Sequence, residues 1–198
     1  MSNNRQNRVS IVFVAAAFAL AACAKTETPP ADTAALAPAP APAPAAAPAI
    51  NDAQIAHIAV TANAIDSAAG ELAKQKGTAK GVKDFAQTMI GDHGGVNKQA
   101  VALATKLGVS PEDNDVSRSL KSGAEANVSN LNTLSGAAFD KAYIDHEVEY
   151  HQAVLDALDK TLIPSAQNAE LKGLLEKARP AFVAHLDRAK SVQASLTK

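Results

Sequence analysis

Three histidines occupy positions where apolar residues are expected in the helical stretches of this 198-residue chain. The stretches repeat apolar residues at alternating three- and four-residue steps, which is the pattern of a helix packed in a bundle. His93, His151 and His185 each interrupt such a series near the middle of its stretch. Because the midpoints of bundled helices lie at similar heights, we expect the three imidazoles to meet in one layer.

Two carboxylates are predicted at the level of this layer. Asp66 lies near the midpoint of the first apolar series, on its flank, and Glu147 precedes His151 by four residues on the same helix face. Neutral imidazole and carboxylate together suit iron, manganese, copper or zinc. The sequence therefore predicts a transition-metal site with the ligands His93, His151, His185, Glu147 and Asp66. Tyr143 and Tyr150 are further participants if the metal supports redox chemistry.

The same pattern has two other interpretations. Histidines within an apolar series are commonly hydrogen-bonded core residues. Burying an imidazole without a hydrogen-bond partner costs about 1–3 kcal/mol of folding free energy. The histidines would then form a structural network with Asp66, Tyr143 and Glu147. Alternatively, they titrate together as a pH sensor, which predicts loosening of the bundle between about pH 7 and 5. His57 and His146 point away from their apolar series, and we expect both at the surface.

Apolar periodicity, caps and stops predict that the folded domain, residues 51–198, is all-α. Bundle helices are expected over residues 52–76, 79–107, 137–162 and 169–196, with a further helix over 116–134. That further helix would be about 28 Å long at 1.5 Å per residue, enough to return the chain from one end of the bundle to the other. The predicted fold is a ferritin-like four-helix bundle with a long helical crossover. Pro164 is expected to end the third bundle helix and Pro180 to kink the last one.

The first 22 residues predict a lipoprotein signal peptide. Arg5 and Arg8 precede an apolar run, Val9–Ala22, that is shorter than the roughly 20 residues of a membrane span. The stretch LAAC, Leu20–Cys23, resembles the bacterial lipobox, which implies cleavage before Cys23 and attachment of fatty acyl chains such as palmitate. No other cysteine exists, so the folded domain has neither disulfides nor thiolate metal ligands.

The residues after the lipobox predict location and partners. Ala24 stands where an aspartate would retain a lipoprotein in the inner membrane of enteric-type bacteria, so we expect an outer-membrane lipoprotein that faces the periplasm. Residues 23–50 are rich in Ala and Pro, which predicts an extended spacer. With 19 basic and 20 acidic residues there is no basic excess. The expected partner is the membrane, through the lipid anchor, and not nucleic acid.

Four stretches resemble the family known as domain of unknown function 4142. They are IDSAAGELA (65–73), VKDFAQTMIGDH (82–93), LSGAAFDKAYIDHEVEYH (134–151) and ARPAFVAHLDRA (178–189). The resemblance covers the folded domain and implies an exported, ferritin-like helical protein with no settled activity. The family commonly has glutamate in place of Asp66, whose shorter side chain reaches less far.

The ferritin-like superfamily implies di-metal carboxylate chemistry, but the chain has no Glu-x-x-His motif. A histidine-rich centre favours one metal over two and argues against ferroxidase or oxygenase activity. No G-x-S-x-G hydrolase motif is present either, so an enzyme is not favoured. The leading hypothesis is a lipid-anchored bundle that binds a transition metal. The alternative is a non-catalytic envelope protein, structural or stress-related, that acts through its surface.

Overall fold

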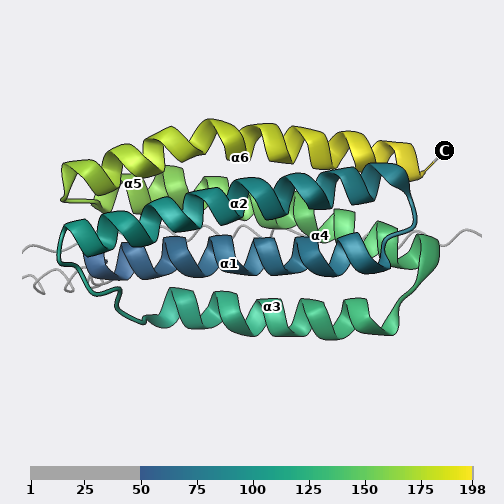
Figure 1. The fold of residues 1–198 in the computed structure, drawn as a ribbon, viewed down its shortest axis with the longest axis horizontal. Helices are drawn as coiled ribbons and strands as arrows, with labels where there is room; N and C mark the ends of the chain where they lie inside the picture. Colours follow the sequence, from purple (N-terminus) through teal and green to yellow (C-terminus); the bar gives the residue numbers. More distant parts are fainter. Residues whose placement is uncertain (1–49, 198) are drawn as a thin grey trace, which may run out of the picture. The chain divides into compact units, whose positions relative to one another are not determined.

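Five long helices make up most of residues 50–197, the part of the chain that this computed structural model describes (Figure 1). They are α1 (Asp52–Lys76), α2 (Lys80–Lys106), α3 (Asp115–Thr133), α4 (Gly136–Ala157) and α6 (Ala169–Leu196). A π-helical turn, η1 (Leu158–Leu162), and the short helix α5 (Ile163–Ser165) join α4 to α6. Residues 50–197 contain no strand, which confirms the prediction of an all-α fold.

Side chains cap the starts of three helices, because the first backbone N–H groups of a helix have no partner within it. Asn51 and Gln54 form a reciprocal capping box at α1. Asn114 and Ser117 form a second box at α3. At α6, the side chain of Asn168 accepts two backbone N–H groups. These caps place the helix starts within a residue or two of the predicted positions.

The start of α2 is held by a residue from another helix. Asp140 of α4 accepts hydrogen bonds from the backbone N–H groups of Thr78 and Ala79, at 2.9 and 2.8 Å, and from the Thr78 hydroxyl. The Asp140 carboxylate is buried and fully used by these donors. It therefore fixes α4 against the link between α1 and α2 and leaves no oxygen for the histidine layer.

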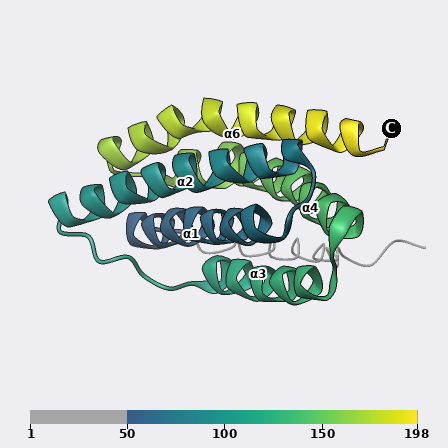
Figure 2. The same cartoon turned by 45° about the vertical axis from the view of Figure 1, so that its right-hand side comes forward.

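The helices pack as two antiparallel hairpins, α1 with α2 and α4 with α6 (Figures 1 and 2). The two hairpins meet where α2 packs on α6 and α1 on α4. Helix α3 lies along α1 and carries the chain from the end of α2 back to the start of α4, so α2 and α4 run in the same direction (Figure 1). The predicted crossover thus occurs at residues 115–133. The assignment of the whole fold to the ferritin-like superfamily stays a prediction.

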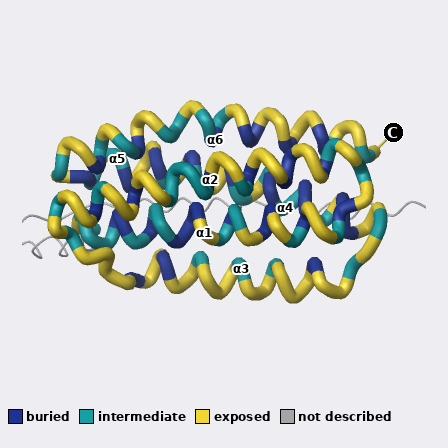
Figure 3. The backbone as a smooth tube through the Cα atoms, in the orientation of Figure 1, coloured by how far each residue is buried: buried dark blue, intermediate teal, exposed yellow. Residues whose placement is uncertain are grey.

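Two apolar clusters form the core, on either side of a buried polar layer. One cluster surrounds Phe85 and Tyr143, and the other surrounds Leu155 and Phe182. Asp66 on α1, His93 on α2, and Glu147 and His151 on α4 fall between the two clusters, and His185 on α6 lies at the edge of the second. Figure 3 shows the buried positions concentrated on the inner faces of the helices. The layer therefore lies inside the core, where any unpaired polar atom is costly.

One prediction about proline needs correction. The third bundle helix does not stop before Pro164, because the chain continues through η1 into α5, which contains Pro164. The wider π-turn removes the need for the proline N–H and accommodates its ring. Pro180 lies inside α6, as predicted, and α6 continues as a single helix from Ala169 to Leu196. The kink expected at Pro180 stays a prediction.

Some predicted features lie outside the described residues. These are the signal peptide, the lipid-bearing Cys23 and most of the Ala/Pro-rich spacer, and they stay predictions. Among residues 50–197, no helix is both long enough and apolar enough to cross a membrane.

Candidate metal centre

The structure brings the five predicted ligand residues together in the buried polar layer. His93, His151, His185, Glu147 and Asp66 come from all four bundle helices, and none is more than 5% exposed. The imidazole ring centroids lie 5.0 to 5.6 Å apart. The structure therefore places all three rings in contact with one another at mid-bundle.

Asn63 determines which nitrogen of His93 carries the proton. The Asn63 side-chain N–H donates to the backbone oxygen of Ala59 at 2.8 Å, so the other amide atom, Oδ1, must be an acceptor. That oxygen lies 2.9 Å from His93 Nδ1. In the neutral ring, Nδ1 is therefore the donor, and Nε2 presents a lone pair to the interior.

The other two imidazoles are oriented in the same way. His151 Nδ1 lies 2.9 Å from the backbone oxygen of Glu147, which can only accept, so its Nε2 presents the lone pair. His185 Nε2 lies 2.9 Å from a carboxylate oxygen of Asp92, which leaves Nδ1 with the lone pair. Each ring thus has one nitrogen held by an outer acceptor and one free nitrogen, which is the usual arrangement of metal-binding histidines.

The Asp66 carboxylate lies between two of these free nitrogens. Its Oδ2 is 3.1 Å from His93 Nε2 and 3.4 Å from His151 Nε2. Two ligands bound at about 2.0–2.1 Å to one tetrahedral ion are about 3.4 Å apart, so these separations match a shared metal. The candidate ligand atoms of the three histidines lie within 4.8 Å of one another, as do those of Asp66, Glu147 and His151.

When the carboxylates are charged, the acceptor atoms around Asp66 and the three imidazoles face each other without a hydrogen-bond donor between them. Among the residues that the structure describes, six buried atoms of the layer have no hydrogen-bond partner: Asp66 Oδ1 and Oδ2, His93 Nε2, His151 Nε2, His185 Nδ1 and Glu147 Oε2. Lone pairs that converge in this way repel unless a cation or a proton lies among them. The layer is therefore chemically incomplete as a set of neutral imidazoles and charged carboxylates.

Burial shifts the pKa values toward the uncharged forms. Desolvation raises the pKa of Asp66 to about 7, and burial together with the neighbouring Asp66 raises that of Glu147 well above its ordinary value. Burial lowers the pKa of His93 to about 3 and that of His151 to about 4. Without metal, burial thus favours protonated, uncharged carboxyl groups and neutral imidazoles in this layer. The low values also argue against His93 and His151 as a sensor between pH 7 and 5.

Other residues singled out in the sequence lie outside the candidate ligand set. Tyr150 donates its hydroxyl to the backbone oxygen of Ala62, while the Tyr143 hydroxyl is buried without a partner among the described residues. His57 and His146 are half-buried, which corrects their predicted surface position, because neighbouring side chains cover them. Neither ring takes part in the histidine cluster.

Comparison with known proteins gives one match. The family described as domain of unknown function DUF4142 matches residues 37–192, most of the chain. The chain belongs to the DUF4142 family. No curated protein and no solved structure matches it. The description of the DUF4142 family states no function for its members.

Two residues that orient the histidines were not found from the sequence. Asn63 precedes Asp66 by three residues on α1, and this spacing on one helix face is the signal that could have identified it. Asp92 is adjacent to His93 in sequence but orients His185, 93 residues away, so no local pattern indicates its role. The Asp92 side chain is 53% exposed, and it connects the buried centre to solvent.

Proposed function

We propose that this protein is a cell-envelope metal-binding protein that holds one transition-metal ion at the centre of its helical bundle. The observation that carries the proposal is the convergence of His93 Nε2, His151 Nε2 and an Asp66 oxygen with no donor between them. A divalent cation replaces the proton that these atoms otherwise share. It also offsets the cost of burying the carboxylates.

The residues have distinct roles in this proposal. His93, His151, His185 and Asp66 are ligands, and Asn63, Asp92 and the Glu147 backbone orient the rings. The Glu147 carboxylate, which has an oxygen within 4.8 Å of candidate ligand atoms of Asp66 and His151, is a fifth ligand or an acceptor close to the metal. Imidazole and carboxylate without thiolate suit iron, manganese, copper or zinc. One ion fits the set better than two, since the layer offers only two carboxylates, Asp66 and Glu147, where di-metal bundles use four.

The proposed location rests on the N-terminal sequence. The lipobox-like LAAC and the Ala/Pro-rich residues 24–50 support a lipid-anchored protein held away from a bacterial membrane. Mass spectrometry of the N-terminal peptide from the membrane fraction tests it. We expect a chain that begins at an acylated Cys23, and an unmodified peptide that retains residues 1–22 would contradict it.

The metal proposal is tested by Asp66→Asn. The full chain is purified without chelators, its metal content is measured by elemental analysis, and the chelator-treated protein is titrated calorimetrically with Fe²⁺, Mn²⁺, Cu²⁺ and Zn²⁺ in turn. We expect the parent to bind about one ion per chain. Asp66→Asn should lose more than the roughly 10–100-fold in affinity that removal of an outer-sphere partner costs.

The metal-free forms distinguish this proposal from a structural network. An asparagine at position 66 offers N–H donors to the free Nε2 atoms, so the metal-free variant should melt no lower than the metal-free parent. If the carboxylate instead accepts hydrogen bonds in a structural network, the variant should lose about 3–5 kcal/mol. Asp187→Asn, on the exposed face of α6, is the matched control for both measurements.

A further inference from the structure

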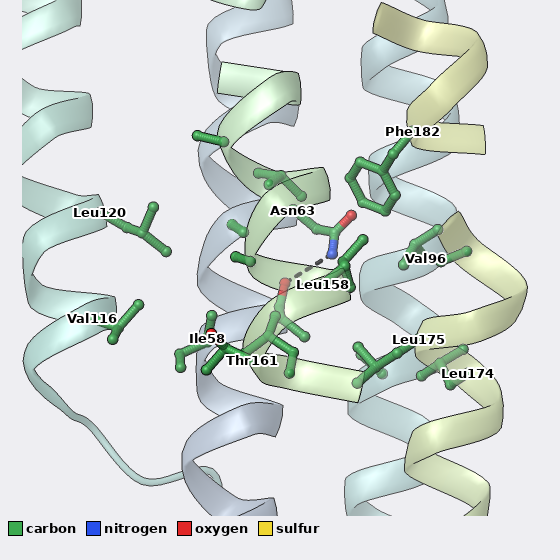
Figure 4. Close-up of a pocket in the computed structure, with 18 of the residues that line it drawn as sticks. Ile58, Asn63, Val96, Val116, Leu120, Leu158, Thr161, Leu174, Leu175 and Phe182 are labelled. Carbon is green, nitrogen blue, oxygen red and sulfur yellow. Dashed lines mark hydrogen bonds between the residues drawn. The ribbon is translucent and has the colours of Figure 1, made fainter. Parts of the chain in front are cut away.

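An apolar cavity of about 200 Å³ lies beside the histidine layer (Figure 4). Side chains from α1, α2, α3, α4, η1 and α6 line it, among them Ile58, Val96, Leu120, Leu158, Leu175 and Phe182. Figure 4 shows Val116 and Leu120 reaching from α3 toward the cavity, on the side opposite Val96 and Phe182. The cavity therefore crosses the bundle from beneath α3 to the inner faces of α2 and α6.

The few polar groups in the wall have partners elsewhere. The Asn63 amide donates to Ala59 and accepts from His93, and the Tyr150 hydroxyl donates to Ala62. Thr161, the third polar side chain in the wall, belongs to an exposed residue at the outer end. A water molecule needs two to four polar partners, which this wall does not supply. The cavity is thus suited to an apolar occupant.

The outer end of the cavity is open to solvent. Val116 of α3 is 44% exposed, and Ala153 and Thr161, on the opposite side, are also exposed. Helix α3 has only two fully buried residues, Ser117 and Leu131, so its middle covers the bundle loosely. Access between α3 and α4 therefore requires little disruption of the core.

We propose that this cavity binds a small apolar molecule, with the bulk of a benzene ring or a short alkyl chain. An enclosed apolar cavity of about 150 Å³ in another protein stays dry and accepts benzene or xenon, and this one is somewhat larger. Filling it restores the dispersion contacts that its lining otherwise lacks. A charged molecule would lose its hydration against this apolar wall without gaining a polar partner.

The bound molecule would be a neighbour of the proposed metal centre. Phe182 lines the cavity, and its ring centroid lies 5.1 Å from that of His93 and 6.1 Å from that of His151. None of the five candidate metal ligands lines the cavity. Binding of the apolar molecule therefore does not depend on the metal, and the two proposals can fail separately.

The test is thermal unfolding of the full chain with and without benzene, followed by circular dichroism, after chelator treatment and again in the presence of Zn²⁺. At ten times its Kd, a ligand that binds only the folded state lowers the unfolding equilibrium constant about elevenfold. For a domain of this size, that corresponds to a rise in Tm of about 3 to 6 °C. We expect this rise in both conditions.

A filled cavity provides the matched variant. Ala178→Leu places three more carbon atoms in the cavity, whereas Ala184→Leu makes the same change on the exposed face of α6. The benzene-dependent rise should disappear in Ala178→Leu and persist in Ala184→Leu. If Ala178→Leu fails to fold, Ala157→Leu fills the cavity from α4. No rise in the parent, or an equal rise in the filled variant, would overturn the proposal.

Discussion

At the scale of single residues, Asp66 shows that tertiary packing determines whether a short side chain can reach its partners. The sequence predicts that an aspartate reaches less far than the glutamate common in the family. In the structure its carboxylate lies within 3.4 Å of two imidazole nitrogens. Gly70, one turn further along α1, has no side chain and lets α2, which carries His93, approach α1 closely. The shorter acid therefore still reaches the imidazole of His93.

Asp92 provides a prediction at the same scale. Its carboxylate holds His185 Nε2 and leaves Nδ1 free for the metal. Asp92→Ala should lower metal affinity by about 10–100-fold, because the imidazole loses its orientation. Calorimetric titration with Zn²⁺ measures the change, with Asp187→Ala as the exposed control. An unchanged affinity would show that His185 is not a ligand.

At the scale of the elements, the contact between α1 and α2 depends on Gly70. A Cβ atom at this position would lie 3.0 Å from the backbone oxygen of Ala86 and 3.1 Å from Ile90 Cγ1. Backbone cannot move away as a flexible side chain can. The close approach therefore has to be maintained by glycine, although the isolated helix would be more stable with alanine.

Gly70→Ala is predicted to destabilise the protein by about 1–3 kcal/mol, since it overpacks the interface between the two helices. Gly91→Ala is the matched control. A Cβ there meets no atom within 4 Å, so the change should stabilise α2 by up to about 1 kcal/mol. Urea denaturation of both variants measures the free energies of unfolding. Equal effects of the two changes would refute the role assigned to Gly70.

At the scale of the whole molecule, the polar layer exchanges protons with solvent on unfolding. In the folded, metal-free protein, Asp66 and Glu147 hold protons, while His93 and His151 do not. The ordinary pKa values are 3.8 for aspartate, 4.5 for glutamate and 6.5 for histidine. In the unfolded chain near pH 5 to 6, the two carboxyl groups are therefore charged and the two histidines are protonated. The two states bind the same number of protons, so this layer makes stability independent of pH there.

Outside that window, stability should fall on both sides. As the pH drops below about 4.5, the unfolded carboxylates regain protons, and the unfolded chain binds more protons than the folded protein. As the pH rises above about 6.5, the unfolded histidines lose theirs, while the raised pKa of Glu147 favours its protonated form in the folded state, so we expect the folded protein to bind more. Each uncompensated proton changes the free energy of unfolding by about 1.4 kcal/mol per pH unit.

Urea denaturation of the chelator-treated chain from pH 4 to 8 measures this profile. The loss above pH 6.5 is the diagnostic part, and Glu147→Gln should remove it because glutamine does not titrate. Surface carboxylates with lowered pKa values, such as Asp113 beside Ser117 and Arg118, add only to the acid side. Stability that stays constant or rises between pH 6.5 and 8 would contradict the protonated state of Glu147.

Local sequence patterns determined the elements and the height of the polar layer. Periodic apolar residues, caps and stops fix helices in a way that is independent of distant residues, so the five long helices and the crossover were predictable. The positions of His93, His151 and His185 near the middle of their helices predicted that they lie at one height along the bundle, because the bundle helices have similar lengths. It could not determine which nitrogen of each ring faces inward.

Tertiary structure alone decided the chemistry of the layer. The outer partner of His185 comes from a residue 93 positions away, and that of His93 from one 30 positions away, so local spacing does not determine which ring either partner orients. Asp140, which shares the face of Glu147 in sequence, is instead used by the start of α2. The apolar cavity likewise depends on how six segments fill a shared space. Hydrogen-bond direction and packing volume are properties of distances between helices, and a single sequence specifies them only through the complete fold.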